Sequence, residues 1–191
     1  MRKINLIVIH CSATKADQEC NADIIDKWHR KRGWRKIGYH YVINRSGLLE
    51  TGRGLEEVGA HVKGKNKHSI GISMIGGLDA NGDPECNYTK EQWKQLDTLV
   101  SQLQADYPEA DVDGHNSFAA KACPCFNVKE WLKNEKKALS WRINLVPNVH
   151  QEMGSPSTMT GMVTALCVTI INTVTVLKLS KNVRLKWQLH S

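Results

Sequence analysis

Residues 4–10 read INLIVIH, a short apolar run that is rich in isoleucine and ends on His10. A short continuous run of this kind is typical of a strand that is buried on both faces of a sheet. His10 would then stand at the end of that strand, at an edge of the sheet. The stretch therefore predicts a domain built around a central sheet.

Helix and strand patterns alternate after this run. Asn21 can cap a helix with an apolar stripe, Thr89 and Gln92 form a capping box ahead of a second helix, and Asn127 repeats the start signal before a third. Further strands are predicted over residues 38–43, 48–51 and 69–75. This alternation predicts an α/β domain with a central mixed β-sheet flanked by helices.

The composition is that of a soluble protein: of 191 residues, 41% are hydrophobic and 24% are charged. A chain of this length can fold without disulfides or a structural metal, so a metal would serve chemistry. Six cysteines are too thinly spread for a disulfide framework, and the N-terminus lacks a signal-peptide pattern. We therefore expect synthesis in a reducing cytoplasm, without a signal peptide.

The net charge of +7 is unevenly distributed. Residues 1–141 hold 21 Lys or Arg against 18 Asp or Glu, a net charge of +3, while residues 142–191 hold 5 against 1, a net charge of +4. A mild excess of base fits an anionic partner such as cell envelope, or simply solubility. Since no stripe of arginines with interleaved aromatics is present, we expect no nucleic-acid partner.

Three residues of metal-binding type stand where an α/β fold would expose them: His10, His115 and Cys123. Two imidazoles and one thiolate suit zinc and leave its fourth position free for water or substrate. Each residue alone is weak evidence, because a single histidine or cysteine is more often structural. Cys123 and Cys125, separated by one proline, also fit one structural cysteine and one bystander.

Several short motifs give the chain a specific resemblance. They are IHCSAT at residues 9–14, GYH at 38–40, VGAHVKG at 58–64, SIGI at 69–72 and KACP at 121–124. In their order they resemble the phage-lysozyme (endolysin) type of zinc amidase, the type 2 N-acetylmuramoyl-L-alanine amidases. The resemblance covers residues 4 to about 135 and implies the amidase and peptidoglycan-recognition-protein-like fold.

The resemblance implies a reaction and a set of site residues. The family cuts the amide bond between N-acetylmuramic acid and the L-alanine of the peptide stem in peptidoglycan. By resemblance His10, His115 and Cys123 bind one zinc ion per chain, while Tyr39 and Lys121 are the matching catalytic positions. Zinc can polarise the scissile carbonyl, and Tyr39 and Lys121 can donate hydrogen bonds to the developing oxyanion.

Other interpretations of these residues stay open. Read without the resemblance, Tyr39 equally fits an aromatic on the core face of a strand, and Lys121 a solvated loop lysine. Which group carries a proton to the leaving amine also stays open, with Tyr39 the favoured candidate. Cys11 is a second thiol near the metal position, although strand alternation predicts that it points away from His10.

A basic loop over residues 59–68 contains two further histidines. We expect His61 to border the substrate groove and to bind substrate, with an ordinary surface histidine as the alternative. His68 is the weaker candidate for the same role. Apart from these two and the candidate ligands His10 and His115, no histidine stands in a sequence pattern that indicates a function.

Two functions compete with hydrolysis. Relatives of this fold that bind peptidoglycan without cutting it typically lack the cysteine ligand, so Cys123 favours an enzyme. A nucleic-acid-binding role is disfavoured by the charge distribution. We therefore expect a monomer that is made in the cytoplasm and acts on peptidoglycan in the cell wall after release.

The motifs predict an amidase domain over residues 1–141 and an irregular C-terminal extension over residues 142–191. Residues 153–177 contain no charged side chain, a length that can cross a bilayer. Their many threonines argue against a membrane span, and their valines and isoleucines suit strands equally well. A poorly ordered extension and a membrane-associated segment both stay open.

Overall fold

The computed structural model describes residues 2–134. The predicted C-terminal extension over residues 142–191, including its uncharged segment, lies outside the described residues. Among residues 2–134, no helix combines the length and the apolar character that crossing a membrane requires.

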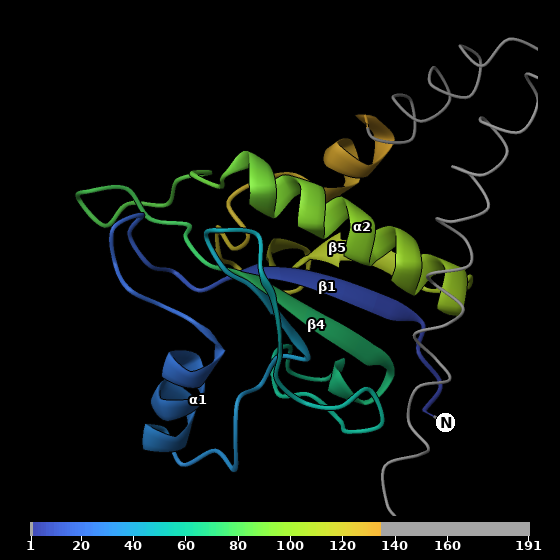
Figure 1. Cartoon of the computed structure of the whole chain (residues 1–191). Helices are drawn as coiled ribbons and strands as arrows, with labels where there is room; N and C mark the ends of the chain where they lie inside the picture. Colours follow the sequence, from blue (N-terminus) through green and yellow to red (C-terminus); the bar gives the residue numbers. More distant parts are fainter. Residues whose placement is uncertain (1, 135–191) are drawn as a thin grey trace, which may run out of the picture. The chain divides into compact units, whose positions relative to one another are not determined.

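Five strands form one mixed sheet, in the order β3-β2-β4-β1-β5. β1 pairs in parallel with both β4 and β5, β4 pairs in parallel with β2, and only β3 runs antiparallel to its neighbour (Figure 1). The predicted α/β class with a central mixed sheet is confirmed. The strands are β1 (Leu6–Cys11), β2 (Tyr41–Ile43), β3 (Leu49–Thr51), β4 (Ser69–Met74) and β5 (Asp111–Gly114).

The two faces of the sheet pack against different helices. Ile7 and Ile9 of β1 share a core cluster with the buried leucines of α2 (Lys90–Asp106). Val42 belongs instead to the cluster of α1 (Ala22–Lys31), although its neighbour Ile43 packs with α2. Successive residues of a strand face opposite sides, so β2 divides its side chains between the two layers. Figure 1 shows α1 and α2 on opposite sides of the sheet.

The helices begin where the sequence predicts. The Asn21 side chain accepts from the Ile24 N–H at 2.9 Å, ahead of α1. Thr89 and Gln92 form the reciprocal capping box of α2, with both bonds at 3.1 Å. Asn127 accepts from the Glu130 N–H at 3.1 Å, and residues 128–134 are helical. A cap of this kind typically contributes about 1 kcal/mol.

The strand predicted over residues 38–43 starts only at Tyr41. The Gly38 N–H donates to His29 Nδ1 at 3.0 Å and not to a neighbouring strand. A Cβ on Gly38 would lie 2.3 Å from the Ala60 carbonyl oxygen, so only glycine fits there. Gly38 is therefore held by a helix side chain, while the His40 N–H donates to the Gly71 carbonyl oxygen of β4 at 2.9 Å, and Tyr39 lies outside the regular sheet.

Two buried histidines make the fold sensitive to acid. Burial lowers the pKa of His29 and of His40 to about 4. Between about pH 6.5 and 4 the unfolded chain therefore binds more protons, so the free energy of unfolding should fall as the pH falls. For His40, which is fully buried, the loss amounts to about 3 kcal/mol.

Urea unfolding of the metal-free protein at pH 7.5 and at pH 4.5 measures this loss. His40→Gln should be less stable than the parent at pH 7.5 and should lose less on acidification. A pH profile that is the same in parent and variant would contradict the assignment.

Candidate metal centre

Parallel pairing brings two of the predicted ligands to one edge of the sheet. His10 is the second-last residue of β1, and His115 directly follows β5 in a short helix, η2 (His115–Ser117). Since neighbouring parallel strands end at the same edge, their carboxyl ends place the two imidazoles together. The ring centroids lie 4.6 Å apart.

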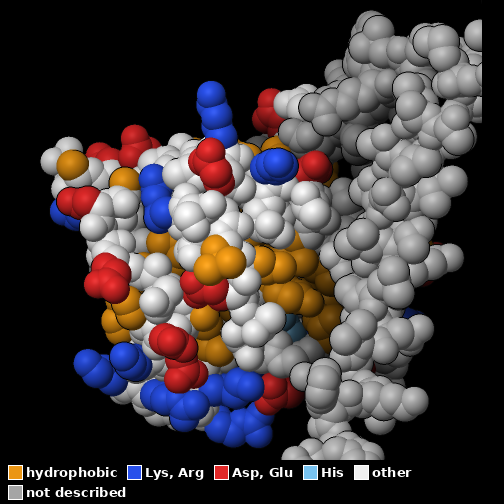
Figure 2. Space-filling model, viewed as in Figure 1, with side chains coloured by type: hydrophobic (Ala, Val, Ile, Leu, Met, Phe, Trp, Pro, Cys, Tyr) orange, Lys and Arg blue, Asp and Glu red, His pale blue; other side chains and the backbone are white. Residues whose placement is uncertain are grey.

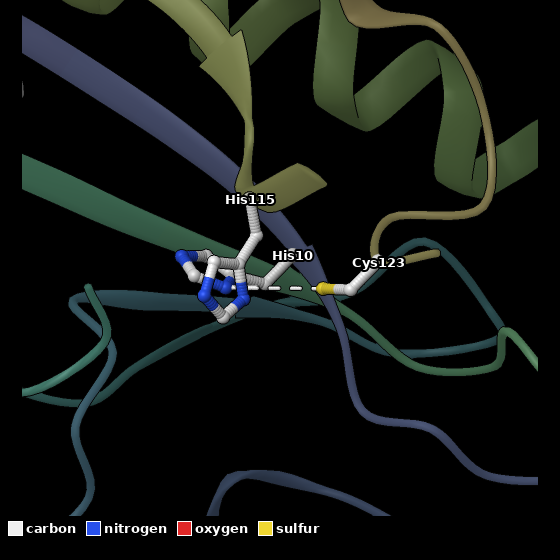
Figure 3. Close-up of side chains that lie close together, drawn as sticks. All are labelled: His10, His115 and Cys123. Carbon is white, nitrogen blue, oxygen red and sulfur yellow. Dashed lines mark hydrogen bonds between the residues drawn. The ribbon is translucent and has the colours of Figure 1, made fainter. Parts of the chain in front are cut away.

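The third predicted ligand, Cys123, comes from a loop that is fastened to the same edge. The Asn116 N–H donates to the Cys123 carbonyl oxygen at 2.8 Å, which ties this loop to the segment that carries His115. The Cys11 N–H donates to Cys123 Sγ at 3.2 Å and holds the sulfur near β1. Figure 3 shows the side chains of Cys123, His10 and His115 converging from three separate segments.

The three side chains form a group whose ligand atoms all lie within 4.8 Å of one another. Cys123 Sγ lies 3.9 Å from His10 Nδ1. A tetrahedral zinc with bonds of about 2.3 Å to sulfur and about 2.1 Å to nitrogen separates these atoms by about 3.6 Å. The donor set and its spacing therefore fit zinc, and three protein ligands leave a fourth position open.

The surroundings keep both histidines in their metal-binding form. Burial lowers the pKa of His10, and the nearby His61, His115 and Lys121 lower it further. Burial and the charge of Lys121 also lower the pKa of His115. A neutral imidazole offers a lone pair to a metal, whereas an imidazolium does not. The neighbouring Cys11 thiol and burial raise the pKa of the Cys123 thiol, so a metal that binds there displaces a proton.

The two predicted catalytic side chains lie beside this group. The Tyr39 ring centroid is 5.1 Å from that of His10. Burial raises the pKa of the Tyr39 phenol, and the neighbouring thiols Cys123 and Cys11 raise it further, so the hydroxyl is a donor at neutral pH. Lys121 is exposed and lines the same cavity as His115.

That cavity has a volume of about 540 Å³ and opens next to the metal group. Apolar and cationic side chains line it, with no Asp or Glu among them. Its lining residues are Trp34, Ala60, His61, Val62, Lys63, Asn66, His115, Phe118, Ala119 and Lys121.

Comparison with known proteins decides the family. Residues 1–126 match the family described as N-acetylmuramoyl-L-alanine amidase. The chain belongs to this family. The amidase is 42% identical to the endolysin of Enterobacteria phage K11 over 134 residues, which are 70% of this chain and 89% of the endolysin. It is 45% identical to the endolysin of Klebsiella phage KP32 over 130 residues, covering 68% of this chain and 86% of that endolysin.

Solved structures agree with this assignment. The amidase superposes on N-acetylmuramoyl-L-alanine amidase LysC from Clostridium intestinale URNW with a TM-score of 0.62 at 29% identity, over 71% of this chain and 87% of LysC. It superposes on Drosophila PGRP-LB with a TM-score of 0.54 at 25% identity, over 65% of this chain and 76% of PGRP-LB. The expected family and its fold are confirmed: this is an enzyme of endolysin type that hydrolyses amide bonds in peptidoglycan.

The structure brings His61 of the amidase closer to the metal group than its loop position suggests. His61 is 9% exposed and lines the cavity. Its Nδ1 lies 3.0 Å from His10 Nε2, and its Nε2 lies 3.1 Å from Ser69 Oγ. His68 takes no part in this group, since its Nδ1 faces the Lys3 carbonyl oxygen at 2.9 Å.

Of the three cysteines near this edge of the sheet, only Cys123 belongs to the metal group. The Cys125 thiol donates instead to the Gly77 carbonyl oxygen at 3.2 Å. Cys11 contacts Cys123 through its backbone N–H, and its thiol is not in the metal group. That the Cys11 side chain points away from His10 stays a prediction.

Proposed function

We propose that the enzyme is a zinc-dependent N-acetylmuramoyl-L-alanine amidase. It would cut the bond between N-acetylmuramic acid and L-alanine with one zinc ion held by His10, His115 and Cys123. The convergence of these three ligand atoms within 4.8 Å carries the proposal. Bound zinc supplies Lewis-acid polarisation of the amide carbonyl and activation of water.

Tyr39 and Lys121 would act on the charge that develops during amide cleavage. The Lys121 cation and the protonated Tyr39 hydroxyl are donors near the metal group, suited to an oxyanion on the former carbonyl. Tyr39 is also the favoured group for passing a proton to the leaving amine of L-alanine. Both tasks belong to the transition state, so neither requires a bond to the metal.

The cavity supports a muropeptide substrate. Trp34 and Phe118 present aromatic surface, which packs on sugar rings, while Lys63 and Lys121 offer cations to the carboxylates of a stem peptide. His61 lines the cavity and would contact the substrate there through ring carbons at the edge of its ring, because both ring nitrogens are engaged elsewhere.

We further infer that residues 1–141 form the catalytic domain, since every proposed site residue lies within them. The enzyme would act as a monomer on the cell wall after release from the cytoplasm. Lys and Arg gather along the lower edge of the face in Figure 2, with acidic side chains beside them, and elsewhere on this face the two kinds are mixed. This face therefore offers no broad basic surface to nucleic acid. Residues 142–191 would be a poorly ordered or membrane-associated extension that catalysis does not need.

Mass spectrometry of purified peptidoglycan after incubation with the enzyme tests the reaction. We expect free stem peptides that begin with L-alanine and intact glycan strands, and we expect a chelator to stop their release. A chain that ends at residue 141 should give the same products. New reducing sugar ends, or release that is indifferent to the chelator, would contradict the proposal.

A further inference from the structure

The His61 ring is held between the metal group and the core of the sheet. On one side its Nδ1 faces His10 Nε2 at 3.0 Å, and on the other its Nε2 faces the hydroxyl of Ser69, the first residue of β4, at 3.1 Å. His10 is 1% exposed and Ser69 is fully buried. Water therefore does not replace either contact.

The position of Cys123 assigns a direction to this chain of hydrogen bonds. Cys123 Sγ lies near His10 Nδ1, so Nδ1 is the atom that His10 offers to a metal. A neutral imidazole that binds a metal through one nitrogen carries its proton on the other. His10 Nε2 is then the donor to His61 Nδ1, which leaves the His61 proton on Nε2, where it can be donated to Ser69 Oγ.

We infer that His61 is a positioning residue for the metal centre: it holds His10 in the tautomer and the ring orientation that zinc requires. The inference rests on the proposed zinc dependence and adds a role to the substrate contact suggested for the ring edge. The group that accepts the hydrogen bond from His10 is the neutral imidazole of His61. His61 comes from a loop that also lines the substrate cavity.

The backbone around the ring is shaped to keep this orientation. A Cβ on Gly71 would lie 2.6 Å from His61 Cγ, and a Cβ on Gly59 would lie 2.6 Å from His61 Cδ2. The loop itself is tied down by the Asn66 side chain, which accepts from the N–H groups of His61 and Val62 at 2.8 and 2.9 Å. The ring therefore has one place to lie, and in that place Nδ1 meets His10.

Zinc affinity of the full chain, measured by competition with a chromophoric chelator, tests this role. His61→Leu removes the acceptor and should weaken zinc binding by about 10- to 100-fold. His61→Asn places an oxygen near the position of Nδ1 and should restore most of the affinity. His68→Leu, a histidine change outside the metal group, should leave it unchanged.

The outcomes separate this inference from the proposed function. If the parent chain binds no zinc, the proposed function fails. If the parent binds zinc and His61→Leu binds it equally well, or Leu and Asn weaken it equally, the positioning role fails.

The tautomers can also be measured without any substitution, in case the variants do not fold. In the zinc-loaded parent, ¹⁵N chemical shifts of the imidazoles should show His10 coordinated through Nδ1 and His61 protonated at Nε2. A His61 protonated at Nδ1 would overturn the inference.

Discussion

Cys123→Ala should lose stoichiometric zinc and, with it, amidase activity. Cys123 is the single thiolate ligand of the proposed set, and two histidines alone leave the metal with too few protein ligands for a catalytic site. Activity should fall to the level of the chelator-treated parent, a loss of on the order of a thousand-fold or more. Elemental analysis and release of stem peptides from peptidoglycan measure the two effects.

Cys125→Ala is the matched control, since it removes a thiol two residues away. Its sulfur donates to the Gly77 carbonyl oxygen and takes no part in the metal group, so both zinc and activity should stay near the parent's values. The zinc assignment is wrong if Cys123→Ala keeps both zinc and full activity. It is equally wrong if Cys125→Ala is the variant that loses the metal.

Tyr39→Phe and Lys121→Ala should keep zinc but lower turnover by about a hundred-fold or more each. Neither side chain belongs to the group of ligand atoms, and each is proposed to donate to charge that develops only in the transition state. Tyr39→Phe keeps the ring beside His10 and removes only the hydroxyl. The rate constant kcat should therefore fall while zinc content does not.

Lys63→Ala controls for the removal of a cation from the same cavity. It should affect KM more than kcat, because Lys63 is proposed to contact substrate and not the reacting amide. Loss of zinc in Tyr39→Phe or Lys121→Ala would contradict the proposal that these residues donate hydrogen bonds in the transition state and do not help to bind the metal. A turnover within a few-fold of the parent would remove either residue from the proposed mechanism.

Local patterns predicted the parts of the fold that depend on neighbours in sequence. The apolar run before His10 predicted a buried strand, and in β1 residues 7–11 are buried, with Ile7 and Ile9 in the cluster of α2. The start signals at Asn21, Thr89 and Asn127 predicted helices that begin at those caps. The cap signals succeed because each cap satisfies a free helical N–H within a few residues. The strand signal succeeds because it needs only the apolar character of consecutive residues.

The start of β2 could not be predicted in this way. Residues 38–43 carry one continuous strand pattern, but the Gly38 N–H bonds to His29, which lies on α1. A side chain nine residues away thus competes with the sheet for the backbone donor. As a result Tyr39 stands on an irregular segment next to His10. Strand alternation alone therefore does not predict the position of its side chain.

The sequence by itself determined the family and the kinds of atom available for the site: two imidazoles, a thiol, a phenol and an ammonium group in recognisable motifs. Only the tertiary structure decided which nitrogen of His10 faces Cys123 and which faces His61. His10 and Cys123 are 113 residues apart, and His10 and His61 are 51 apart. Contacts over such separations depend on the parallel pairing of β1 with β4 and β5 and on loop anchors such as Asn66 and Asn116, which no periodicity within one segment can report.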